Sequence, residues 1–225
     1  MNKRIVTLLF LLAELILYIL ILTTGGTLLV ASSYIAIVLC FVYALLHIRQ
    51  GDQLIIGGLF CTAMADWFLV VCSPIEQLWG MAFFLVAQIL YAMRLHREHP
   101  SRVLLALRAG VTAVAMGIAA LVLREKTDAL ALVSICYYAN LIVNIVAAFA
   151  RFRGNRMFAV GLVLFILCDT VIGLQMAAGV YLTIPAESLL HRIIFMEFHL
   201  SWFFYLPSQV LIALCSGKRG REIDV

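Results

Sequence analysis

The chain is dominated by long apolar stretches, separated by short segments that contain charged residues, glycine or proline. A helix needs roughly 20 apolar residues to cross the hydrocarbon core of a bilayer. These stretches are too long and too irregular for the strands of a membrane barrel, and helices satisfy their own backbone in lipid. The sequence therefore predicts an all-α, polytopic membrane protein with about eight transmembrane helices. The predicted spans lie near residues 4–24, 27–47, 54–72, 77–93, 103–123, 129–150, 157–177 and 194–215.

The composition excludes a soluble protein. Residues of the hydrophobic class make up 65% of the chain and charged residues only 12%, whereas a soluble domain carries about 25% charged residues. The first apolar run resembles a signal peptide, but it is too long and has Glu14 at its centre. We therefore predict that this run is the first span of a single membrane domain, residues 1–225.

The basic residues are distributed unevenly between the predicted loops. If the N-terminus is cytoplasmic, the outer loops hold few basic residues, Arg124 and Lys126 among them. This asymmetry is what the positive-inside rule requires, so we predict a multi-pass protein of the cell membrane with both termini in the cytoplasm. The net charge of +4 then reflects topology and contact with membrane lipid, and it predicts no nucleic-acid partner. The inner group comprises Lys3, Arg4, Arg49, Arg94, Arg97, Arg102, Arg151, Arg153, Arg156, Lys218, Arg219 and Arg221.

The two halves of the chain contain matching motifs. GLFCTAMAD at 58–66 matches GLVLFILCD at 161–169, and FFLVAQILYAM at 83–93 matches FYLPSQVLIAL at 204–214. Four predicted spans separate the members of each pair, so matching segments cross the membrane in the same direction. This predicts two parallel four-helix repeats, about 1–98 and about 99–225, related by an axis along the membrane normal.

The repeat places Asp66 and Asp169 at the same depth, roughly 13 residues into their spans and near the midplane. A charged carboxylate at this depth costs about 2.5–3.5 kcal/mol, so it usually lines a cavity or has a partner. Two neighbouring carboxyls can divide their work, one protonated and one ionised, as acid-catalysed hydrolysis requires. We predict that Asp66 and Asp169 are a catalytic pair. The structural alternative is that each aspartate links two helices by hydrogen bonds.

Further polar side chains lie within the predicted spans, and each is a candidate for contact with substrate or for bonding between helices. No sequence motif for a metal, a nucleotide or a nucleophilic serine is present, so we predict no metal and no cofactor. Glu197 and His199, with His191 and Arg192 nearby, are expected at the membrane surface. The candidate substrate-binding residues are Gln88, Asn140, Asn144, Gln209, Tyr137 and Glu14.

The motifs around the aspartates resemble those of the YhhN-type lysoplasmalogenase family of small eight-span membrane proteins. The resemblance is clearest in AMADWFLV at 63–70, VAQILYAM at 86–93, LFILCDTVIGL at 164–174 and FFYLPSQVLIAL at 203–214. The chain departs from the family pattern where ASSYIAIV, residues 31–38, replaces a Lys-Pro pair. It also has Ala65 in place of glycine and Gln88 in place of a frequent histidine.

The resemblance implies hydrolysis of the vinyl ether bond of a lysoplasmalogen, which releases a fatty aldehyde and a glycerophospho-headgroup. It implies a lysophospholipid as the substrate. The short inner loops leave little surface for a large soluble partner, so we predict no obligate protein partner. Two alternatives are open. Parallel repeats with polar residues at the midplane also occur in small transporters, and the missing Lys-Pro and histidine favour a lipid-binding protein without catalysis.

Overall fold

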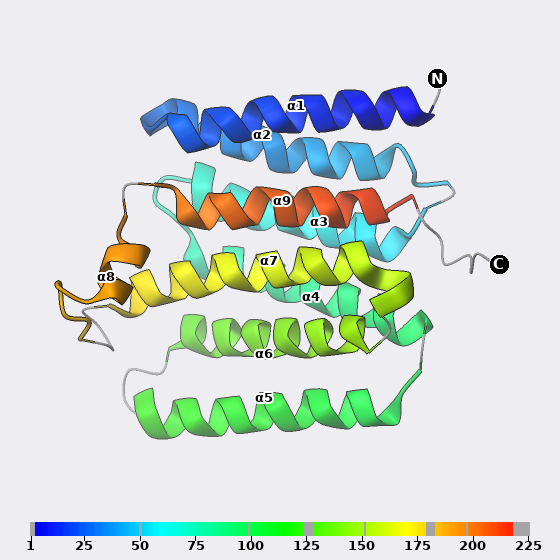
Figure 1. The fold of residues 1–225 in the computed structure, drawn as a ribbon. Helices are drawn as coiled ribbons and strands as arrows, with labels where there is room; N and C mark the ends of the chain where they lie inside the picture. Colours follow the sequence, from blue (N-terminus) through cyan, green and yellow to red (C-terminus); the bar gives the residue numbers. More distant parts are fainter. Residues whose placement is uncertain are drawn as a thin grey trace.

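The computed structural model describes residues 3–49, 51–98, 100–123, 128–150, 152–178, 183–196 and 198–217. These residues form a bundle of helices that lie side by side with their axes roughly aligned (Figure 1). In chain order the helices are α1 (Lys3–Thr23), α2 (Gly26–Leu45), α3 (Gln53–Asp66), the π-helix η1 (Trp67–Val71), α4 (Gln77–Glu98), α5 (Arg102–Leu123), α6 (Ala129–Phe149), α7 (Phe152–Ala177), α8 (Leu189–Ile194) and α9 (Leu200–Cys215).

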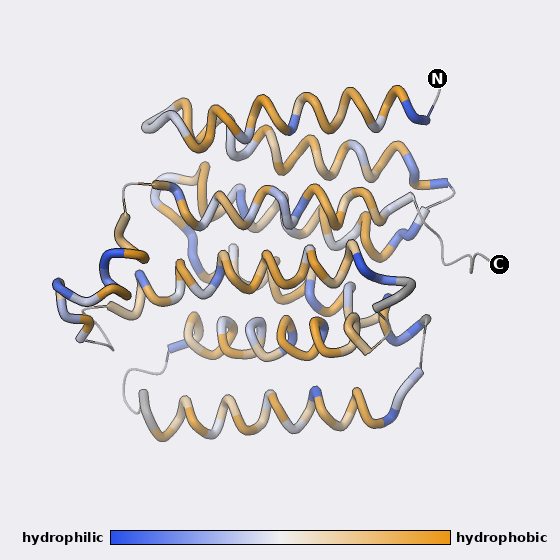
Figure 2. Tube along the Cα trace, in the orientation of Figure 1, coloured by the Kyte–Doolittle hydropathy of each residue, from blue (hydrophilic) through white to orange (hydrophobic). Residues whose placement is uncertain are grey.

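Seven helical segments among the described residues are long and apolar enough to cross a membrane: α1, α2, α3 together with η1, α4, α5, α6 and α7. They coincide with the first seven predicted spans, and the predicted all-helical membrane fold is confirmed. Figure 2 shows hydrophobic residues along the whole length of these helices, with hydrophilic residues gathered mainly near their ends.

The predicted eighth span, 194–215, is divided in the structure. α8 ends at Ile194, and α9 begins only at Leu200 and has 16 residues. At 1.5 Å per residue α9 is about 24 Å long, which is shorter than the hydrocarbon core of about 30 Å. The start of α9 is held beside the α1–α2 turn, because Nε2 of His199 lies 3.1 Å from the carbonyl oxygen of Thr24. Glu197 lies outside the described residues.

The helices of each half of the bundle pack against one another in the same order. Consecutive helices pack on one another from α1 to α4, and again through α5, α6, α7 and α9. α4 packs on α6 and α9 packs on α2, so corresponding helices join the halves. α1 and α5 lie at opposite edges of the bundle (Figure 1). This order is the one expected of two four-helix units, and the boundary between repeats near residue 98 stays a prediction.

α1 begins and α9 ends at the same end of the bundle (Figure 1). Arg124 and Lys126, which define the predicted outer side, lie outside the described residues. Several members of the inner group also lie outside them, namely Arg151, Lys218, Arg219 and Arg221. The cytoplasmic position of both termini therefore stays a prediction.

The glycines that open the two matching motifs lie at close helix contacts. A Cβ atom on Gly58 would run into the ring of Tyr91 on α4, and one on Gly161 would lie 3.2 Å from the carbonyl oxygen of Ser208 on α9. These glycines let α3 approach α4 and α7 approach α9. The aspartate eight residues after each glycine therefore projects from a tightly packed helix.

A buried ionic cluster joins α3, α4 and α7 at the end of the bundle where the chain starts. Asp52 caps α3 by accepting a hydrogen bond from the Leu54 amide at 3.1 Å. Its Oδ2 also accepts from Arg94 at 3.0 Å and from Arg97 at 2.8 Å. Arg94 donates a further bond to Asn155 on α7 at 3.0 Å. The ionic cluster fixes how far these three helices are displaced along one another, and so the depth of the aspartates on α3 and α7.

Candidate functional site

Asp66 is the last residue of α3 and is only 3% exposed. Its Oδ2 accepts a hydrogen bond of 2.6 Å from the hydroxyl group of Tyr205 on α9. A buried carboxyl without a partner in this apolar setting would be costly. The bond to Tyr205 therefore holds Asp66 in one orientation and links α3 to α9.

Asp169, on α7, has a corresponding partner. The hydroxyl group of Tyr137, on α6, donates a hydrogen bond to Oδ2 of Asp169. Tyr137 is buried, whereas Asp169 is partly exposed. The structure thus contains two Asp–Tyr pairs, and Asp169 is the less completely buried of the two aspartates.

The two pairs border one aromatic cluster, made of Phe84, Phe165, Tyr137 and Tyr205. The ring centre of Phe84 lies 5.7 Å from that of Tyr137 and 6.3 Å from that of Tyr205. The ring centre of Phe165 lies 6.3 Å and 5.5 Å from the same two rings. Both Asp–Tyr pairs therefore meet at the same aromatic cluster, and a shared catalytic site for the two aspartates stays a prediction.

A π-helical turn begins immediately after Asp66. η1 covers Trp67–Val71, and the Cys72 amide donates to the carbonyl oxygen of Trp67 at 2.9 Å, five residues back. The turn ends the helical segment, since Cys72 has an extended backbone, and π-type turns are common at the C-terminal ends of helices. The irregularity lies beside one of the two predicted catalytic residues.

Tyr205 was missed as a site residue by reasoning from the sequence, and so was Tyr34. Tyr137 follows Tyr34 by 103 residues, the same interval that separates Asp169 from Asp66. The Tyr34 ring packs on Trp67 with ring centres 5.5 Å apart, and the Tyr34 side chain is within electrostatic reach of Asp66. Extending the repeat comparison to the tyrosines would have revealed Tyr34 as the counterpart of Tyr137.

Three predicted substrate-binding residues form a separate polar network with an arginine. Arg108 on α5 donates to the side-chain oxygen of Asn140, and to that of Asn144 at 2.8 Å. Asn144 in turn donates to both the backbone and the side-chain oxygen of Gln88 at 2.9 Å. The network links α5, α6 and α4. Arg108 was missed because it lies within one predicted span yet close to its start.

Glu14 and Gln209 are buried elsewhere in the bundle. Glu14 accepts a hydrogen bond from Sγ of Cys40 at 3.4 Å, and Gln209 donates to Oγ of Ser208 at 3.5 Å. Among the contacts of the described residues, neither side chain reaches Asp66 or Asp169. Within the same residues, no three His, Cys, Asp or Glu side chains gather closely enough to hold a metal ion.

Paired carboxyls around an aromatic cluster, in a bundle of apolar helices, define a polytopic membrane protein with a polar site in its interior. A family model described as the YhhN family matches residues 26–215, which is most of the chain. The chain belongs to the YhhN family, as the resemblance of its motifs predicted. Neither the curated proteins nor the solved structures compared with the chain match it.

Proposed function

We propose that this chain is an integral membrane hydrolase that cleaves the vinyl ether bond of a lysoplasmalogen, with Asp66 and Asp169 as its acid and base. The observation that carries the proposal is the pair of Asp–Tyr contacts around one aromatic cluster. Membership of the YhhN family supports the same function. A single-chain lipid enters such a site from the bilayer.

The chemistry needs only an acid, a base and water. The protonated carboxyl transfers its proton to the ether's outer vinyl carbon, so that a C–H bond replaces the π bond. The positive charge is then shared between the inner carbon and the ether oxygen. Water adds to the inner carbon and gives up a proton to a carboxylate, which restores the proton count. In the resulting hemiacetal a protonated carboxyl gives its proton to the glycerol oxygen as the bond between that oxygen and carbon breaks, and a carboxylate takes the proton of the hydroxyl group, so that the products are an aldehyde and a glycerophospho-headgroup.

The tyrosines support this division of work. Each hydroxyl group donates to one carboxylate oxygen and leaves the other free to give or take a proton. The aromatic cluster keeps bulk water away from Asp66, and Asp169 is less completely buried than Asp66. An ionised carboxylate near the cationic intermediate stabilises it strongly in an apolar setting.

The test uses purified protein in detergent, with a lysoplasmalogen as substrate and the released aldehyde measured by mass spectrometry. Asp66→Asn and Asp169→Asn should each reduce kcat by about 10²- to 10⁴-fold, the usual contribution of an acid or base. Asp128→Asn is the matched control, since Asp128 is exposed and caps α6, and asparagine caps equally well.

A lysophospholipid with a saturated alkyl ether of the same chain length is the substrate control. It has no vinyl carbon to protonate and should release no aldehyde. Absence of aldehyde from the wild-type protein with lysoplasmalogen, or undiminished release from both aspartate variants, would contradict the proposed function.

A further inference from the structure

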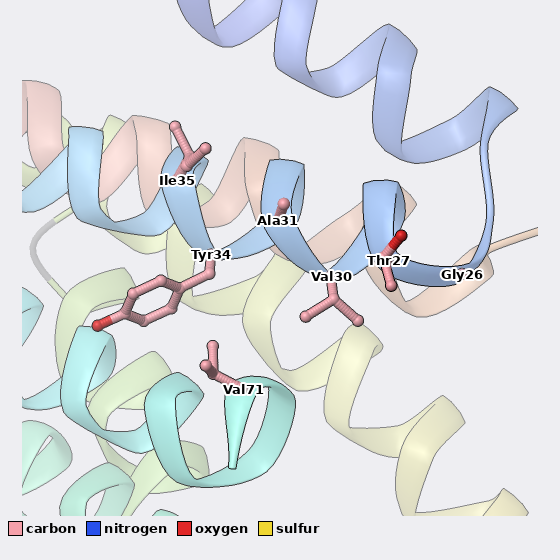
Figure 3. A pocket seen from close by; sticks show the side chains of 7 residues that line it. All are labelled: Gly26, Thr27, Val30, Ala31, Tyr34, Ile35 and Val71. Atoms are coloured by element: carbon pink, nitrogen blue, oxygen red, sulfur yellow. The ribbon is translucent and has the colours of Figure 1, made fainter. Parts of the chain in front are cut away.

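An apolar groove lies between α2 and η1. Its walls are residues of α2 from Gly26 to Ile35, faced by Val71 of η1 (Figure 3), and its volume is about 690 Å³. This volume is within the range of about 300–1,000 Å³ that is usual for small-molecule sites. The groove begins at the first residue of α2 and follows this helix for about 13 Å.

The groove leads to the candidate site through Tyr34. Figure 3 shows the Tyr34 ring extending from α2 toward α3, with Val71 facing it across the groove. The same ring packs on Trp67, the residue that follows Asp66. Tyr34 therefore forms both a wall of the groove and part of the surroundings of the Asp66 carboxyl.

The residues that line the groove determine which kind of molecule can bind there. Apart from the Tyr34 ring and the hydroxyl groups of Thr27 and Tyr34, the described side chains that line the groove are aliphatic or, at Gly26, absent. None of the described residues that line it is charged, so they offer nothing to hold a phosphate or an ammonium group. An alkyl chain fits walls of this kind. The π-helical turn supplies the opposite wall, because it carries Val71.

We propose that the groove between α2 and η1 holds the hydrocarbon chain of a single-chain lipid and guides its ether bond past Tyr34 to Asp66. This inference rests on the proposed function and names the part of the protein that binds the substrate's chain. The lipid then enters the candidate site from the side on which Asp66 lies.

Photolabelling tests the groove without any need for turnover. The probe is a saturated 1-alkyl lysophospholipid with a diazirine midway along its chain, added to the wild-type protein in nanodiscs. After irradiation, the labelled residues are found by peptide mass spectrometry. Label concentrated on α2 between Thr27 and Ile35 and on Val71 is the expected result. Label spread evenly over the lipid-facing helices, α5 included, would overturn the proposal.

A pair of tryptophan variants provides the control. Ala31→Trp fills the groove, whereas Ala113→Trp places the same side chain on the exposed face of α5. Labelling of the groove should fall to background in the first variant and stay at the wild-type level in the second. A diacyl phospholipid with the same diazirine-bearing chain should label the groove weakly. Equal labelling by both lipids would mean that the groove is ordinary lipid-facing surface, and would refute the proposal.

The outcomes separate this inference from the proposed hydrolysis. Groove-specific labelling together with absence of aldehyde release would preserve lipid binding and reject catalysis. Aldehyde release from Ala31→Trp at the wild-type kcat/KM would preserve catalysis and reject the groove as the path of the chain.

Discussion

Replacing Tyr205 by phenylalanine tests the link between packing and chemistry at Asp66. The substitution keeps the ring within the aromatic cluster and removes only the hydroxyl group that donates to Asp66 at 2.6 Å. A hydrogen bond to a charged group is worth about 1.5–3 kcal/mol, and 1.36 kcal/mol corresponds to a tenfold change in rate. We therefore expect kcat/KM for lysoplasmalogen to fall by about 10- to 150-fold.

The effect on stability should be smaller than the effect on activity. Side-chain hydrogen bonds between membrane helices contribute about 0.6 kcal/mol on average and about 1.7 kcal/mol at most, since the unfolded chain in a membrane also finds partners. Aldehyde release and the midpoint of thermal unfolding, measured on the same preparation, separate the two effects.

Tyr18→Phe is the matched control for Tyr205→Phe. Its hydroxyl group donates to the carbonyl oxygen of Phe203 at 3.0 Å on the exposed surface, so it also links α9 to another helix. This variant should keep wild-type activity. If Tyr205→Phe were as active as Tyr18→Phe while Asp66→Asn was inactive, Tyr205 would have no part in positioning the Asp66 carboxyl.

Three further substitutions test the packing that positions the site. Gly58→Ala should lower the midpoint of thermal unfolding, because overpacking costs about 1–3 kcal/mol. Gly110→Ala should leave the midpoint unchanged, since a Cβ atom at this position has open space around it. Equal midpoints for the two variants would contradict the close contact at Gly58. Asp52→Leu removes the carboxylate that binds the arginines of the ionic cluster. It should lower the free energy of unfolding, measured in detergent, by about 3–5 kcal/mol. A free energy equal to that of the wild-type protein would show that the cluster does not stabilise the bundle. Arg108→Met removes the donor that binds two asparagines and should speed hydrogen exchange of the α5 backbone amides. Arg102→Met, at the exposed start of the same helix, is the control and should not change this exchange. Identical exchange rates in both variants would show that the polar network does not hold α5 in place.

The helices were predictable because lipid imposes one strict requirement on length and polarity. Seven long apolar runs became seven long helices, with ends close to those predicted. Asp66 and Asp169 could be predicted as site residues for the same reason, since inserting a carboxyl group among apolar residues in a membrane costs free energy. The eighth span was less predictable, because Phe195, Met196 and Phe198 extend the apolar pattern of α9 toward its start without belonging to its helix.

The partners of the aspartates were harder to predict than the aspartates. Tyr205 and Asp66 lie 139 residues apart in the sequence, and only the packing of α9 beside α3 brings them together. A tyrosine within an apolar span also has an ordinary role in packing, so its presence alone indicates no site. Gln88 shows the reverse case, because its polarity suggested contact with substrate while its amide oxygen binds Asn144.

The π-helical turn makes the length of one segment as important as its composition. A π-helical turn holds one residue more than an α-helical turn, so loss of a single residue from 68–71 would restore α-helical geometry. The remaining residues of the segment would then rotate by about 100° about the helix axis, and an aliphatic side chain would leave the wall that faces Tyr34. In an alignment of the YhhN family, a one-residue gap at this point would mark members that shape this side of the site differently, even where both aspartates are present.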